Sequence, residues 1–140
     1  MLTVIAVLAV VLGVIAPSFV DFLAGQQARA LSYDLAADLV LARNEALKRN
    51  ASVAIARGGS GWEQGWTVAT VGSATLLSHR NPAALAVTVS GAPASITFDV
   101  NGRVSSPAAA VRITITGRTN SRCVELDLSG RARTLGGACA

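Results

Sequence analysis

Two arginines near the C-terminus have the spacing that most clearly predicts chemistry. Arg131 and Arg133 follow Gly130 and lie two positions apart, so on an extended segment their side chains point to the same side. Guanidinium groups suit planar, bidentate recognition of phosphate or carboxylate. We therefore predict a phosphate clamp on this segment, with a solvated polar face as the alternative. Three further arginines would extend the basic surface: Arg112, Arg118 and Arg122.

Two cysteines flank the arginine pair. Cys123 and Cys139 are the only cysteines of the chain and fit one disulfide in an oxidising compartment. That bond would close a loop of about 15 residues, which the chain-entropy model credits with about 3 kcal/mol. It would also hold the two arginines on a constrained hairpin or loop. Two cysteines are too few for a zinc site, so we expect no metal.

The other polar residues form no catalytic motif. His79 is the only histidine, and we expect it at the surface; the eight carboxylates are scattered. The glycine-rich turn at 58–61 precedes a predicted strand, so it lacks the helix N-terminus of a phosphate cradle. Trp62 and Trp66 could stack on bases or sugars, but we expect at least one to cover the core of a small sheet domain. The sequence therefore predicts a protein that is not an enzyme and carries no cofactor.

The chain begins with an apolar segment. Residues 1–20 contain no charged side chain, and 20 helical residues span about 30 Å, the thickness of a bilayer core. We predict an apolar transmembrane or filament-core helix over 1–24, bent at Pro17, which removes a backbone donor. The alternatives are a buried core helix and a secretory signal cleaved near Ala28-Arg29-Ala30, although a signal needs a basic segment before its apolar one.

An amphipathic helix is predicted over 26–49, continuous with the apolar segment. Its apolar residues recur at steps of three and four, which indicates one stripe packed against a folded domain. Those residues are Leu31, Leu35, Leu39, Ala42 and Ala46. Together the two segments make one helix of about 45–50 residues.

From 51 to 140 the hydrophobic period changes to two, which predicts about six to eight short antiparallel strands packed on the stripe. Leu85, Val87 and Val89 alternate in one of them, and Asn101-Gly102 between two others is a strong hairpin signal. We find no internal repeat. A chain of 140 residues has room for one domain, so the fold class is α+β. The net charge of +4 is weak evidence for a nucleic-acid partner.

The order of these features resembles the type IV pilins. The apolar start, with its segment Ala16-Pro17-Ser18-Phe19, resembles the pilin helix. The segment 39–50, which reads LVLARNEALKRN, closely resembles the FimT/GspH family of minor pilins and type II secretion pseudopilins. Weaker matches are Gly65-Trp66, Ile96-Thr97-Phe98, Gly102-Arg103 and Gly130-Arg131. The resemblance implies a type IV pilin-like fold, in which a long N-terminal helix, its first half transmembrane, packs on antiparallel sheets of a periplasmic head at 25–140.

The chain departs from this family at its start. The family begins with a short basic leader, a cleavage site before a methylated aromatic residue, and a glutamate a few positions on, and the chain as written has none of these. The resemblance implies either that the true start lies upstream of Met1 or that the chain is truncated. Prepilin peptidase would be a partner if a leader precedes Met1.

The resemblance implies a subunit held in the bacterial inner membrane by a single span and then assembled with other pilins through its N-terminal helix. Two functions fit: a type II secretion pseudopilin or pilus subunit, and a FimT-like minor pilin that captures DNA for natural transformation. For the second, Gly130, Arg131 and Arg133 match the family's Gly-Arg-x-Arg motif. The rivals from other classes are a tethered periplasmic enzyme and a sugar-binding protein that uses Trp62 and Trp66.

Overall fold

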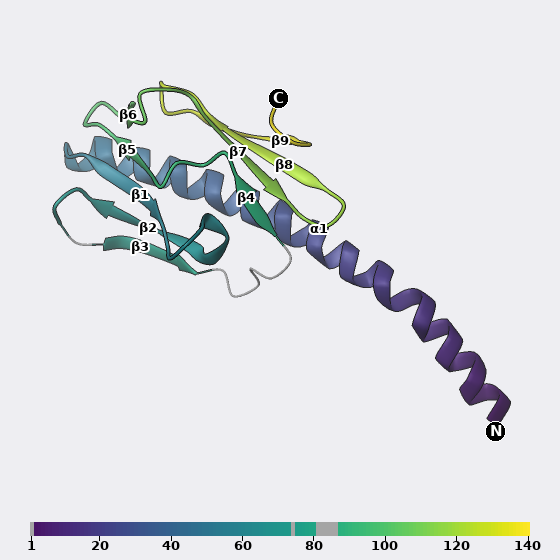
Figure 1. Cartoon of the computed structure of the whole chain (residues 1–140). Coiled ribbons are helices and arrows are strands. Elements are labelled where there is room, and N and C mark those ends of the chain that lie inside the picture. Colours follow the sequence, from purple (N-terminus) through teal and green to yellow (C-terminus); the bar gives the residue numbers. More distant parts are fainter. Residues whose placement is uncertain (1, 74, 81–86) are drawn as a thin grey trace.

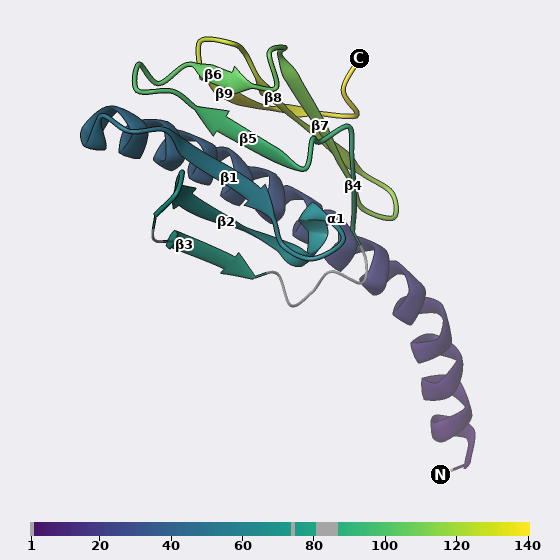
Figure 2. The same ribbon diagram turned by 60° about the vertical axis from the view of Figure 1, so that its left-hand side comes forward.

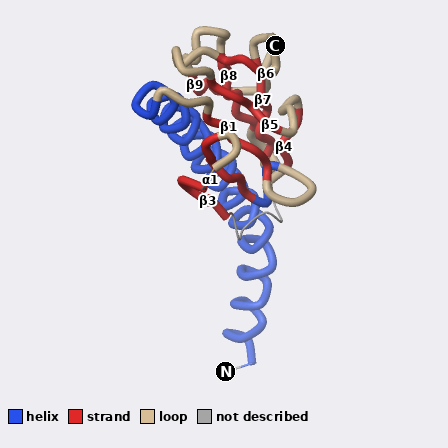
Figure 3. Tube along the Cα trace, turned by 90° about the vertical axis from the view of Figure 1, so that its left-hand side faces the viewer, coloured by secondary structure: helices blue, strands red, loops and turns tan. Residues whose placement is uncertain are grey.

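One long helix underlies two antiparallel sheets in the computed structural model, which describes residues 2–73, 75–80 and 87–140 (Figure 1). The helix, α1, runs without interruption over Leu2–Arg49 and is 48 residues long, as the apolar and amphipathic segments together predict. Its C-terminal half carries the sheets, and its N-terminal part projects beyond every strand (Figures 1 and 3). The predicted pilin-like arrangement of helix and sheets is confirmed.

The predicted stripe of α1 forms one side of the core. Each of its members is buried: Leu31, Leu35, Leu39, Ala42 and Ala46. They pack in one cluster with strand residues such as Ile55, Phe98 and Ile113. Burial of such apolar side chains contributes about 1.5–3 kcal/mol each, so this stripe attaches both sheets to the helix.

The first sheet covers one side of α1, with strand order β3-β2-β1-β5-β6 and every neighbouring pair antiparallel. Its strands are β1 (Val53–Arg57), β2 (Gly65–Thr70), β3 (Thr75–Arg80), β5 (Ser95–Phe98) and β6 (Val104–Ser106). A short 3-10 helix, η1 (Trp62–Gln64), leads into β2. The predicted Asn101-Gly102 hairpin is confirmed as the connection between β5 and β6.

The second sheet has the order β4-β7-β8-β9 and is also antiparallel. Its strands are β4 (Thr88–Ser90), β7 (Val111–Thr116), β8 (Ser121–Leu126) and β9 (Ala132–Gly136). The described residues thus contain nine strands, one more than the upper expectation. The predicted alternation that begins at Leu85 falls partly outside the described residues.

Both tryptophans belong to the core, where at least one was expected. Trp62 and Trp66 are buried, and the indole of Trp66 donates a hydrogen bond to the Asp38 carboxylate of α1 at 2.7 Å. The ring of His79 stacks on Trp66, with 4.4 Å between centroids. Only 28% of the His79 side chain is exposed, so this residue of β3, expected at the surface, is half-buried between Trp66 and Asp38 of α1.

The N-terminal part of α1 curves away from the straight part under the sheets (Figure 2). The predicted kink at Pro17 stays a prediction. Among the described residues, no helix is long and apolar enough to cross a membrane. The membrane span proposed for 1–24 likewise stays a prediction.

Candidate functional site

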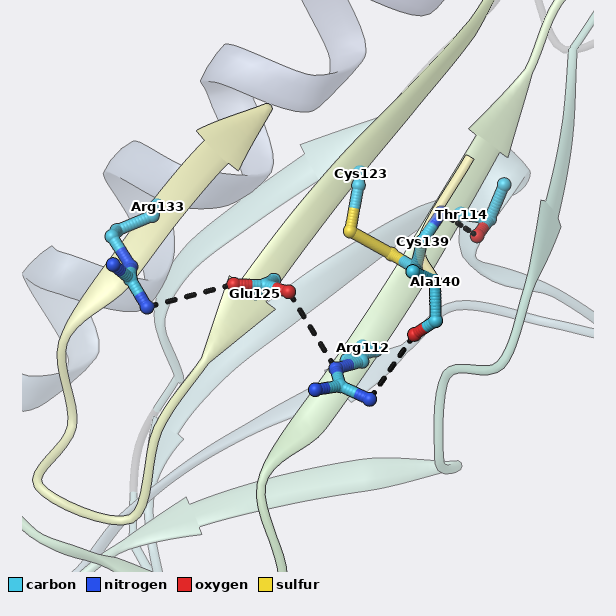
Figure 4. Close-up of a disulfide and its surroundings, with 7 residues drawn as sticks. All are labelled: Arg112, Thr114, Cys123, Glu125, Arg133, Cys139 and Ala140. Carbon is cyan, nitrogen blue, oxygen red and sulfur yellow. Dashed lines mark hydrogen bonds and ion pairs between the residues drawn. A yellow bond between two sulfur atoms is a disulfide. The ribbon is translucent and has the colours of Figure 1, made fainter. Parts of the chain in front are cut away.

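A disulfide closes the C-terminal segment as predicted. Cys123 of β8 is joined to Cys139, with 5.0 Å between their Cα atoms. The amide of Cys139 also donates to the hydroxyl of Thr114 on β7 at 3.1 Å (Figure 4). The segment after β9 is therefore fastened across the outer face of the second sheet.

Arg133 lies in a row of charges across three strands. The register places Arg112 of β7 opposite Glu125 of β8, and Glu125 opposite Arg133 of β9. Arg112 Nε lies 3.5 Å from one Glu125 oxygen, and Arg133 Nη2 lies 3.6 Å from the other (Figure 4). Glu125 thus neutralises part of this basic row, which keeps an excess of one positive charge.

Arg131 lies in the tight turn between β8 and β9. The amide of Gly130 donates to the Asp127 carbonyl at 2.9 Å, and the amide of Arg131 donates to the Asp127 carboxylate at 3.0 Å. The Ser129 hydroxyl donates to the same carboxylate and, with the Arg131 amide, holds the pKa of Asp127 below its ordinary value. The Arg131 side chain is exposed, and the described residues contain no ion pair with it.

Gly130 shapes this turn and is itself buried. Its φ of 79° lies in the left-handed region that L side chains rarely adopt. A Cβ at this position would collide with the carbonyl oxygen of Gly102 and lie 3.1 Å from the Arg43 side chain. Its part in the predicted phosphate clamp is thus to set the backbone, not to contact a ligand.

Arg118 and Arg122 lie at the opposite end of β8. Arg118 belongs to the turn between β7 and β8, where its guanidinium pairs with Asp21 of α1 at 3.6 Å. Arg122 shares the inward face with Ile115, its register partner, and lines a cleft of ≈ 450 Å³ with Gln26 and Arg29 of the helix. Six residues of strand span about 20 Å, so the structure does not unite these two arginines with Arg131.

A short repeat was missed in the sequence. The five residues Asp-x-x-Gly-Arg occur at 99–103 and again at 127–131. The structure brings the two copies into contact, together with Arg43 of α1. Arg103 and Arg43 are therefore neighbours of the predicted site, although the spacing of residues in the sequence did not predict either of them. The signal was present in the printed sequence, but five residues with two variable positions are too short to predict spatial contact.

The comparisons with known proteins agree with the fold. The model of the family "Type II transport protein GspH" matches residues 32–130. Two crystal structures of the type IV minor pilin FimU from Pseudomonas aeruginosa, in space groups P21 and P65, are similar to the chain. The TM-scores are 0.69 and 0.66, each at 22% identity, over 79% and 76% of this chain and 89% and 91% of those chains. No match was found among the curated proteins.

A long helix beneath two antiparallel sheets, shared with FimU, defines a protein of the type IV pilin-like class. The family match covers well over half of the sequence. The chain belongs to the GspH family, whose members and structural neighbours are pilin-like structural subunits and not enzymes.

Proposed function

We propose that this chain is a minor pilin or pseudopilin, joined through α1 to other subunits of a type IV pilus-like or type II secretion filament. The family match and the likeness to a type IV minor pilin support this role. The observation that carries it is the exposed apolar surface of α1. Large apolar side chains are exposed on the helix: Phe19, Val20, Phe22, Leu23, Tyr33, Val40, Leu41 and Leu47.

Such a surface on one helix indicates a partner, because a contiguous apolar patch in water favours association. Phe19 and Phe22 lie where the helix leaves the head, and the apolar part beyond them is uncharged in sequence. We expect neighbouring subunits to pack helix against helix there. Before assembly, the uncharged segment would hold the protein in the inner membrane with its head in the periplasm.

The test places one charge on this surface. Phe22→Asp should lower incorporation into filaments sheared from the host bacterium at least tenfold, because a buried unpaired carboxylate is costly. Val71→Asp is the matched control: Phe22 is 61% exposed and Val71 is 59% exposed, but Val71 lies in the turn between β2 and β3. Equal incorporation of both variants, measured by immunoblot of the filament fraction, would refute assembly through this part of α1.

Secretion and pilus functions are separated by deleting the gene. A pseudopilin predicts loss of folded proteins from the culture medium with pili intact. A pilus subunit predicts the reverse: fewer surface pili and unchanged secretion. Restoration by the wild-type gene on a plasmid assigns the defect to this chain.

A second candidate function is DNA capture at Arg131. The exposed guanidinium on a turn fixed by Asp127 supports it, because phosphate contacts are made by exposed arginines held on ordered backbone. Arg133, which shares Glu125 with Arg112, would contribute less. Full-length protein in mild detergent should bind labelled duplex DNA with an affinity that falls steeply as salt rises. Arg131→Ala should make that dependence shallower, and absence of binding at low salt would exclude this function.

A further inference from the structure

Two turns of the head share a sequence and a hydrogen-bond pattern. In the turns at 99–103 and 127–131, the glycine amide donates to the aspartate carbonyl at 2.9 Å in both. The arginine amide donates to the aspartate carboxylate at 2.9 and 3.0 Å, and the aspartate amide donates to the arginine carbonyl at 2.9 and 3.2 Å. Arg103 and Arg131 therefore leave the backbone at equivalent points of two equivalent turns.

The two turns also touch each other. A side chain on Gly130 would strike the Gly102 carbonyl, and the Val104 amide donates to the Leu128 carbonyl at 3.1 Å. They lie side by side near the C-terminal end of α1 in both views of the ribbon (Figures 1 and 2). Glycine at 130 permits this contact, whereas a Cβ on Gly102 would lie 3.0 Å from Leu47 of α1 and not against the other turn.

Arg43 of the helix fills the junction. Its Nε donates to the Gly102 carbonyl at 3.1 Å, and its side chain lies against Gly130. One guanidinium thus connects both turns to α1. This contact fixes the position of the turns relative to each other, and with it the origins of the two exposed arginine side chains.

The charges at this end favour an anion. Arg103 and Arg131 are exposed, and no ion pair of either is found among the described residues. The nearby carboxylates of Asp99 and Asp127 already accept backbone amides within the turns. Three arginines therefore lie in or between two turns whose two carboxylates are engaged in shaping the turns.

From this geometry we infer that Arg103 contacts the ligand together with Arg131, and we call these two side chains the arms of the site. Arg43 is the positioning residue that holds the two turns, and with them the arms, together. The inference rests on the proposed DNA role of Arg131. The ligand it fits is the phosphate backbone of duplex DNA, because both arginines belong to exposed turns. Neither the cleft at Arg122 nor a smaller one beside Trp66 and His79 includes them. An extended polyanion can contact both arms, whereas a small anion would find no enclosure.

The test measures the salt dependence of DNA binding by single variants of the full-length chain in mild detergent. Each arginine contact with a phosphate contributes about 0.9 to the slope of log K against log salt, or about eightfold in affinity at 0.1 M salt. Arg103→Ala should therefore lower affinity and slope as much as Arg131→Ala does. Arg103→Lys should retain the slope, because it keeps the charge. Free inorganic phosphate at the same ionic strength should not displace the DNA.

Arg57→Ala is the matched control. Arg57 is also exposed, but it lies at the end of β1 that pairs toward the start of β5, away from the 99–103 turn. If Arg103→Ala behaves like Arg57→Ala while Arg131→Ala weakens binding, the second arm is refuted and the DNA role stands. If the wild type binds no DNA at low salt, both fail. Equal losses in all three variants would indicate general charge attraction and would also refute the paired site.

Discussion

The two turns that bound β8 carry the same Gly-Arg dipeptide and use its arginine differently. At both, glycine lets the turn press on a distant carbonyl: a Cβ on Gly117 would lie 2.7 Å from the Ala24 oxygen, and one on Gly130 would collide with Gly102. Arg118 then pairs with Asp21 of the helix, whereas Arg131 extends from its turn without an ion pair among the described residues.

In both turns the glycine allows the backbone to pack closely against a distant carbonyl oxygen. The role of the arginine depends on whether a nearby carboxylate is free to pair with it. Asp21 lies on α1 and forms an ion pair with the Arg118 guanidinium. At the other turn Asp127 belongs to the turn itself and is occupied by the backbone and Ser129. One arginine is therefore paired with a carboxylate of the helix, and the other is available to a partner.

The largest expected effect on stability among the tests of this comparison is that of Gly130→Ala. The substitution adds a clash with backbone to an unfavourable φ, so we expect a loss of about 4 kcal/mol in the free energy of unfolding. Gly117→Ala adds a clash without a positive φ and should cost about 2 kcal/mol. Urea unfolding of each variant, followed by tryptophan fluorescence, measures both.

Gly72→Ala is the control for the cost of placing a side chain at a positive φ, without any clash. Gly72 has a φ of 77° and open space around its Cβ position, so its substitution should cost about 1 kcal/mol. A Gly130→Ala variant no less stable than Gly72→Ala would mean that the two Asp-x-x-Gly-Arg turns do not press on each other.

Removing the Arg43 guanidinium should have the next largest effect. Arg43→Met keeps much of the packing but leaves the Gly102 carbonyl without its charged donor, which we expect to cost about 2 kcal/mol. Hydrogen exchange of the Gly102 and Gly130 amides should accelerate together. Lys48→Met, with its side chain 77% exposed on the same helix, should leave both rates unchanged. Faster exchange at only one of the two glycine amides would argue against a junction shared by the turns at 99–103 and 127–131.

The fold was predictable where local pattern decides it. Steps of three and four gave the stripe from Leu31 to Ala46, and Asn101-Gly102 gave its hairpin, because both signals depend on neighbours in the chain. The candidate site was less predictable. Arg118 and Arg131 are near in sequence, but the strand between them carries them to opposite ends of the sheet.

Contacts between distant segments account for the rest. His79 stacks on Trp66 beside Asp38, three residues from three elements whose meeting no spacing indicates. Arg43 reads as one more polar residue of an amphipathic helix, yet its Nε bonds a carbonyl 59 residues away. Such partners are set by how the sheets sit on the helix, which hydrophobic periodicity alone does not determine.

A smaller effect is expected from the ion pair at the first turn. Both side chains of the Arg118–Asp21 pair are substantially exposed, so Arg118→Ala should change the free energy of unfolding by less than about 1 kcal/mol. The difference should vanish at high salt, because exposed pairs are screened. DNA affinity should stay at the wild-type level, in contrast to Arg131→Ala. A loss of affinity equal to that of Arg131→Ala would erase the distinction between the two turns.

The smallest effect is a pH dependence of the turn at 127–131. Hydrogen bonds from Ser129 and from the Arg131 amide hold the pKa of Asp127 below its ordinary value. A carboxyl with a depressed pKa in the folded state contributes stability above its unfolded value, and that contribution is lost as pH falls below about 4. The amide resonance of Arg131 should therefore shift on acidification, while that of Arg118 in the first turn does not follow the same titration. Asp127→Asn should abolish the shift at Arg131, and its persistence in this variant would assign the titration to another group.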